Sequence, residues 1–220
     1  MKDIILFGDC VETLKQFDEK ARCCITSPPY YGLRDYGGED DQIGLESSPE
    51  EYIQKLVEVF REVRNNLTDD GTLWVNIGDS YYNYRPGKGQ GLVKQTVSAT
   101  KQDLPDKCAR RGNKLDGLKE KDLIGIPWML AFALRADGWY LRQDIIWHKP
   151  NPMPESVRDR CTKSHEYIFL LSKNQNYYFD VDAIKEPTRR KRSVWNINKK
   201  AYKDAHFAVY PPELVIPCIK

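Results

Sequence analysis

The stretch ARCCITSPPY, residues 21–30, decides the fold of this chain. Its apolar first half, Ala21 to Ile25, predicts a strand, and Thr26-Ser27-Pro28-Pro29-Tyr30 follows where that strand ends. Two successive prolines fix φ and lack backbone donors, so the turn is stiff and presents carbonyl oxygens to a ligand. A ligand-binding loop at the end of a strand is typical of open α/β sheets.

The segments around this stretch alternate between strand and helix patterns. Ile4–Phe7 is a short apolar run that predicts a strand, and Gly8-Asp9 then leads into a helix at Val11–Phe17. Downstream, Pro49–Leu67 carries apolar residues at helical spacing, and Thr72–Ile77 has the composition of a buried strand. Strand, helix and strand in this order predict a parallel sheet with helices on its faces.

The second half of the chain continues the pattern. Leu123–Ala136 predicts a helix whose apolar run, Ile126–Leu134, is too short to span a membrane. Gly138–Pro154 predicts a strand that runs into a proline-stiffened loop, and Ser164–Ser172 predicts the next strand. We therefore expect a single α/β domain over residues 1–220, with a mostly parallel sheet and helices on both faces.

Several short motifs occur in an order that is hard to obtain by chance. They are Gly8-Asp9, Ser27–Tyr30, Trp147-His-Lys-Pro-Asn151, Ser164-His-Glu-Tyr167 and Tyr210-Pro-Pro-Glu-Leu214. With these motifs the chain resembles the DNA amino-methyltransferases, which methylate cytosine at N4 or adenine at N6. The resemblance implies a Rossmann-like fold that depends on S-adenosyl-L-methionine. In this family Ser-Pro-Pro-Tyr is mostly the cytosine-N4 signature, so adenine is the near alternative.

The chemistry of such a loop starts from a poor nucleophile, because the amino nitrogen of cytosine delocalises its lone pair into the ring. Acceptors held against the amino hydrogens would localise that pair for attack on a sulfonium methyl group. The resemblance implies that the Ser27 hydroxyl and the Pro28 carbonyl are these acceptors, that Pro29 stiffens the turn, and that Tyr30 stacks on an extruded base. The alternative is a plain Pro-Pro turn with Tyr30 in the core.

The resemblance also implies residues that bind S-adenosyl-L-methionine: Asp9 near its adenine, Thr26 in the loop, and Pro211 and Leu214 around its methionine part. Asp9 could equally cap the helix that follows it. The family's Gly-rich cofactor turn, commonly Asp-Pro-Phe-x-Gly-Ser-Gly, is not found before Lys220. The order therefore indicates the permuted arrangement with the catalytic half first, incomplete at its C-terminus. Alternatives are a DNA-binding fragment without catalysis and one half of a split enzyme.

Charge is distributed unevenly, although the net charge is only +2. Lys185–Lys203 contains eight lysines or arginines against the single acid Glu186, which suits phosphate contacts in double-stranded DNA. A solvated basic loop is the alternative. The polar inserts 84–121 and 185–205 are candidate target-recognition regions. The residues expected to bind DNA are Lys149, Asn151, Arg189, Arg190, Lys191 and Arg192.

Other features limit the class of protein. The six cysteines show no Cys-x-x-Cys spacing, so neither a metal site nor a disulfide framework is predicted. No signal or membrane segment is visible, and we expect a cytoplasmic, DNA-associated protein of prokaryotic or phage origin. A cognate restriction endonuclease, or a second chain that supplies the cofactor half, is a candidate partner.

Overall fold

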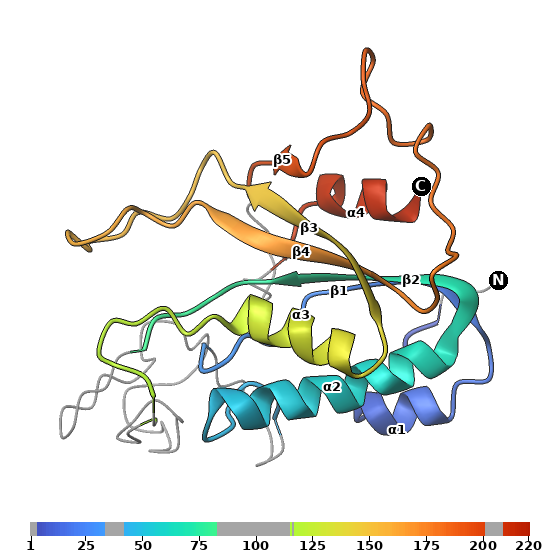
Figure 1. Ribbon diagram of the computed structural model, residues 1–220, viewed down its shortest axis with the longest axis horizontal. Coiled ribbons are helices and arrows are strands. Elements are labelled where there is room, and N and C mark those ends of the chain that lie inside the picture. The colour runs from blue at the N-terminus through green and yellow to red at the C-terminus, as the bar shows by residue number, and fades with distance from the viewer. Residues whose placement is uncertain (1–3, 34–41, 83–114, 116, 201–208) are drawn as a thin grey trace.

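A five-stranded sheet with helices against both faces organises the computed structural model, which describes residues 4–33, 42–82, 115, 117–200 and 209–220 (Figure 1). The elements in chain order are α1 (Cys10–Lys15), β1 (Ala21–Thr26), α2 (Pro49–Asn66), β2 (Leu67–Ile77), α3 (Ile126–Ala136), β3 (Tyr140–His148), β4 (His165–Ser172), β5 (Val194–Asn196) and α4 (Pro212–Ile219).

The sheet is mixed, with strand order β1-β2-β4-β3-β5. β1 pairs with β2 in parallel and β3 with β5 in parallel, whereas β4 is antiparallel to both of its neighbours. The α/β class is confirmed, and four of the five described strands run in the same direction, with only β4 reversed. β4 is reversed because the connection at residues 149–164 contains no helix and returns the chain beside β3 in the opposite direction. A parallel neighbour would need a crossover, usually helical.

Two apolar layers lie on opposite faces of the sheet, as expected. α2 and α3 cover one face, where Leu73 and Val75 of β2 join their core cluster. α4 covers the other, where Trp74 packs in a cluster with Leu214 and Cys218. In Figure 1, α1, α2 and α3 lie below the sheet and α4 lies above it. Successive residues of β2 and β4 therefore bury alternately against one layer and then the other.

The element boundaries differ from those expected by a few residues. α2 has Ser48 as its N-cap residue. β2 begins at Leu67, directly after the end of α2 and five residues before the predicted strand start at Thr72. α3 begins at Ile126 rather than Leu123. A carboxylate from another segment, that of Asp79, accepts from the backbone N–H groups of Gly125 and Ile126 and so caps this helix. Such a cap is invisible to local sequence rules.

The predicted strand at Ile4–Phe7 is not found. The run is extended but unpaired, and all four side chains are exposed, with Ile5 at 78% and Phe7 at 87%. β1, the edge strand of the described sheet, pairs only with β2. An apolar run becomes a strand only where a neighbour supplies a hydrogen-bond ladder, and no described segment supplies one here.

Most of the predicted recognition inserts lies outside the described residues. Of insert 84–121 the structure describes only 115 and 117–121, and of insert 185–205 it describes 185–200. Within the described part of the chain, no helix is both long and apolar enough to cross a membrane.

Burial of β4 from both faces leads to a stability prediction. Leu170 and Leu171 are both almost fully buried, but in opposite clusters. Leu170→Ala and Leu171→Ala should each destabilise the protein by about 2–5 kcal/mol in chemical denaturation, because each removes packing from its own layer. Ile5→Ala, at an exposed site, serves as the control and should be near neutral. A near-neutral result for one of the two leucines would mean that its layer is not a packed core.

Candidate active site

The Ser-Pro-Pro-Tyr loop follows directly from the end of β1 and is held rigidly. The Tyr52 hydroxyl of α2 donates to the Pro29 carbonyl at 2.7 Å, and the Leu33 N–H donates to the Tyr30 carbonyl at 3.2 Å. The Pro28 carbonyl accepts no hydrogen bond from the residues that the structure describes. The loop is therefore fixed through one proline carbonyl while the other remains available to a ligand.

The ring of Tyr30 packs against the end of β2. A Cβ atom added at Gly78 would lie 2.7 Å from Cε2 of that ring, closer than any carbon atom can approach. Only glycine at this position lets the ring lie so close to the backbone. The contact sets the ring at the carboxyl end of the parallel β1–β2 pair, where open α/β sheets bind ligands.

The phenol of Tyr30 belongs to a network centred on Glu166 at the start of β4. It donates to Glu166 Oε2 at 2.8 Å, and the same oxygen accepts from the Asn76 amide at 3.1 Å. Lys149, whose ammonium lies 4.3 Å from the centre of the Trp147 ring, forms an ion pair with Glu166 Oε1. The Lys149 and Glu166 side chains are only 14% and 17% exposed. One poorly solvated carboxylate thus joins residues from β2, β4 and the loops after β1 and β3.

The pKa of Tyr30 is raised well above its ordinary value, first by burial and then by the charge of Glu166. A hydrogen bond from the Ser27 hydroxyl acts in the opposite direction and lowers it. The phenol therefore stays protonated near neutral pH. It donates its hydrogen to Glu166.

A small pocket lies between β1, β2, β4 and α4. Its lining is largely apolar. Thr26 and Leu214, two of the residues predicted to bind the cofactor, both line it, and so does Asn76 of the Glu166 network. The loop and the pocket therefore adjoin through Thr26 and Asn76. The complete lining is Ile25, Thr26, Trp74, Asn76, Ile168, Tyr210, Leu214, Val215 and Cys218.

Two other predicted cofactor residues do not line this pocket. Asp9 caps α1, and one of its carboxylate oxygens accepts from the backbone N–H groups of Val11 and Glu12 at 2.9 and 3.0 Å. Pro211 is the N-cap residue of α4 and is buried. These contacts support the alternative role of Asp9, that of a helix cap. Cofactor contact by Asp9 and Pro211 stays a prediction.

The residues predicted to bind DNA lie in two places. Lys149 belongs to the Glu166 network. Asn151 uses both ends of its amide on the backbone of Lys199, at 2.9 and 3.1 Å, and so ties two loops together.

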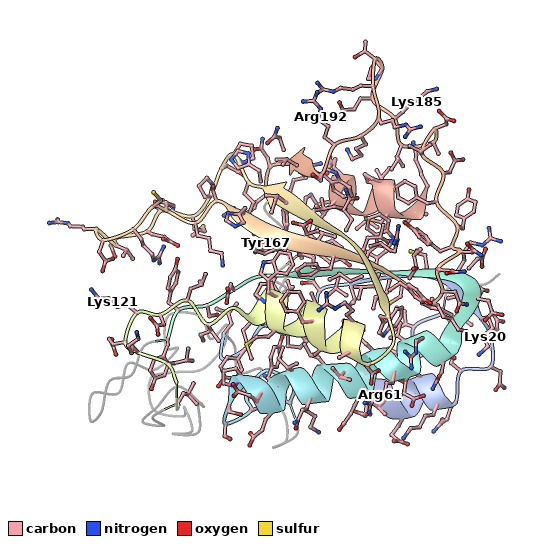
Figure 2. All side chains as sticks on the ribbon, viewed as in Figure 1. Lys20, Arg61, Lys121, Tyr167, Lys185 and Arg192 are labelled. Atoms are coloured by element: carbon pink, nitrogen blue, oxygen red, sulfur yellow. The ribbon has the colours of Figure 1, made fainter. Side chains whose placement is uncertain are left out.

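The basic segment 185–192 projects from the sheet on the side of α4, and Figure 2 labels Lys185 and Arg192 on it. Arg190 and Arg192 are exposed there. Arg189 is paired with Glu186 at 2.5 Å, and Lys191 lies over the Trp195 ring.

Sequence reasoning assigned no role to two residues that the structure places at the centre of the site. Asn76 is a buried amide within the apolar strand β2, and Glu166 is the acid between His165 and Tyr167. A polar residue inside a buried strand needs a hydrogen-bond partner, and this could have marked Asn76 from the sequence. Nothing local could have identified Glu166 as the partner, since 90 residues separate the two.

The fold and site together define a class: an α/β protein with a rigid acceptor-bearing loop beside a largely apolar pocket at the carboxyl end of parallel strands. The chain belongs to the N6/N4 DNA methylase family, whose model matches residues 21–220. It is 51% identical over 218 residues to the Type II methyltransferase M.Cfr9I of Citrobacter freundii. That match covers 96% of this chain and 70% of the relative.

Solved structures show the same fold. The PvuII DNA methyltransferase, described as cytosine-N4-specific, superposes with a TM-score of 0.63 at 15% identity, over 94% of this chain and 65% of that one. A putative DNA modification methylase from Thermus thermophilus, solved with S-adenosyl-L-methionine, gives a TM-score of 0.51 at 21% identity, over 86% of this chain and 64% of that one. At these identities the likeness concerns the fold.

The close contact at Gly78 yields a prediction for activity. Gly78→Ala must displace the Tyr30 ring, and a shift of about 1 Å in a catalytic group can cost about 100-fold in rate. We expect methyl transfer to DNA to fall by about that factor while the folded fraction, followed by circular dichroism, is retained. Glu58→Ala, at an exposed position on α2, is the control. Equal activity of the two variants would show that the position of Tyr30 does not matter.

Proposed function

We propose that this protein is a site-specific DNA methyltransferase that transfers a methyl group from S-adenosyl-L-methionine to N4 of cytosine. The observation that carries the proposal is the position of Ser27 and Pro28. They lie on a loop held by Tyr52 and Gly78, directly after Thr26, which lines the pocket. An amino group bound to the loop would face a methyl donor in the pocket.

The loop residues act on the lone pair of the target nitrogen. The Ser27 hydroxyl oxygen and the Pro28 carbonyl accept the two amino hydrogens, which favours a tetrahedral nitrogen with its lone pair directed away from the ring. Pro29 keeps the Pro28 carbonyl in place, because the φ of Pro29 is fixed and its own carbonyl accepts a hydrogen bond from the Tyr52 hydroxyl. Positioning and electrostatic stabilisation of this kind need no covalent enzyme intermediate.

The chemistry of the pocket lining suits part of the proposed methyl donor. Its apolar lining suits the methionine chain, while the Thr26 hydroxyl and the Asn76 amide supply the few polar groups. We assign Thr26, Leu214 and Pro211 to this part and Asp9 to the adenine side. When bound, the cofactor supplies a methyl group on a positively charged sulfur. The chain's own residues orient the acceptor and exclude water behind α4.

The proposed substrate is double-stranded DNA with the target base extruded, because the amino group of a stacked base cannot reach such a loop. The ring of Tyr30 stacks on the extruded base. Lys149 and Asn151 line the approach to the extruded base. Residues 189–192 of the basic segment contact DNA phosphates away from that base. The Type II names of the relatives support a paired restriction endonuclease as a partner.

Two alternatives remain to be tested against this proposal. Adenine-N6 methylation differs only in the base, and the preference for serine over aspartate before Pro-Pro is a tendency of the family. A protein of another class, a DNA-binding fragment or one half of a split enzyme, would follow if residues 1–220 bind the cofactor poorly by themselves. Calorimetry with S-adenosyl-L-methionine tests this directly. Tight binding by residues 1–220 would exclude the fragment without a cofactor site.

The central prediction concerns the loop. In the intact enzyme, Ser27→Ala should lower single-turnover methyl transfer by about 100-fold or more, and Tyr30→Ala should do the same, because each removes a group that holds the base. Ser193→Ala, at an exposed site, is the control. Mass spectrometry of the nucleosides should detect N4-methylcytosine. N6-methyladenine as the product, or full activity of both loop variants, would overturn the assignment.

A second prediction concerns the basic segment. The slope of log K against log salt for DNA binding changes by about 0.9 for each phosphate contact that is lost. Arg190→Gln and Arg192→Gln should each reduce the slope by up to that amount. Arg189→Gln should reduce it less, because that guanidinium is already paired with Glu186. Slopes that do not change would assign the segment to a solvated surface.

A further inference from the structure

A line of polar groups leads from the loop into the protein. The Ser27 hydroxyl acts to lower the pKa of the Tyr30 phenol, and the phenol donates its own hydrogen to Glu166 Oε2 at 2.8 Å. The line has a direction, since it begins at the loop that would hold the target base and ends at a carboxylate.

The proposed reaction releases a proton from the amino group, and an acceptor must take it up. Attack by a neutral amino nitrogen on a sulfonium methyl group forms an N–C bond, breaks a C–S bond and leaves the positive charge on nitrogen. That nitrogen shares its lone pair with the ring, so in its protonated form it is a much stronger acid than a carboxylic acid. Removing its extra hydrogen as the N–C bond forms would stabilise the transition state.

We propose that Glu166 takes up this proton through Tyr30, acting as a positioning and proton-accepting residue that does not itself touch the base. The amino N–H bond breaks as its hydrogen passes to Ser27 Oγ. The Ser27 hydrogen passes to the Tyr30 oxygen, and the Tyr30 hydrogen passes to Glu166. Both hydroxyls end neutral, Glu166 ends protonated, and the methylated amino group ends neutral. The inference rests on the proposed methyl transfer.

Charged and polar groups surround the Glu166 carboxylate. Its other oxygen is paired with Lys149, and the Asn76 amide donates to the oxygen that faces Tyr30. Lys163 and Lys199 also act on it electrostatically, as does the neighbouring His165. Because the Glu166 side chain is 17% exposed, the proton can leave to solvent after the reaction.

The alternative is that Glu166 only holds the Tyr30 ring in place. The two roles differ in what they predict for a conservative change. Glu166→Gln keeps the size of the side chain and an oxygen that accepts from Tyr30, but an amide cannot take up a proton near neutral pH. Tyr30→Phe keeps the ring against Gly78 and interrupts the line. A purely structural role would therefore be largely preserved in Glu166→Gln, whereas proton uptake would be lost.

The test is the single-turnover rate of methyl transfer in the intact enzyme as a function of pH. Wild type should slow at acidic pH, because a proton acceptor works only while it is unprotonated. Glu166→Gln should be slower by about 100-fold or more and should lose that acidic dependence. The double variant Tyr30→Phe with Glu166→Gln should be no slower than the slower single variant, because both changes interrupt one line. Glu58→Gln, exposed on α2, is the control.

Each outcome decides the matter. An unchanged rate or an unchanged acidic dependence in Glu166→Gln would overturn the inference, and so would strictly additive losses in the double variant. Binding of DNA and of S-adenosyl-L-methionine, measured in the same variants, should stay at the wild-type level. If wild type transfers no methyl group to DNA, the proposed function itself fails. That result is distinct from an active wild type with an equally active Glu166→Gln.

Discussion

The antiparallel pairing of β4 with β2 is the constraint on which the rest of the site depends. Because the two strands run in opposite directions, the first residues of β4 lie beside the last residues of β2, with Tyr167 opposite Ile77 and Ile168 opposite Asn76. Glu166 therefore stands at the carboxyl end of β1 and β2, where the Ser-Pro-Pro-Tyr loop leaves the sheet. If β4 ran parallel to β2, Glu166 would lie at the opposite end of the strands, and the phenol of Tyr30 would have no carboxylate to bind.

This pairing also explains how a poorly solvated carboxylate is tolerated. Burying a charge is costly unless it is paired and hydrogen-bonded, and Glu166 has Lys149 on one oxygen with Tyr30 and Asn76 on the other. Removing one partner would leave the remaining groups unsatisfied in a region with little water. The rigidity of the loop and the state of the carboxylate are therefore linked, because Tyr30 belongs to both. The close approach of its ring to Gly78 fixes the geometry further.

Much of the fold follows from local patterns, since helices and strands with apolar periodicity depend on residues near in sequence. The pattern identified β1, α2, β2, α3 and β4 with only small shifts at their ends. It was wrong for Ile4–Phe7, because pairing requires a neighbour that composition does not reveal. It did not predict the direction of β4, which depends on how segment 149–164 returns. The motif predicted Ser27 and Tyr30 as site residues, but the partner Glu166 became evident only once four strands were placed together.

The groups that hold the proposed acceptor come from separate segments, yet all lie within one described sheet. Ser27 and Tyr30 follow β1, Asn76 belongs to β2, Lys149 follows β3 and Glu166 begins the strand between them. The pocket for the proposed donor is built differently, from residues of β1, β2 and β4 and from α4 on the opposite face. Thr26 and Asn76 have neighbours on both sides. A change at either would therefore affect acceptor and donor together, whereas changes at Glu166 or Leu214 should separate the two functions.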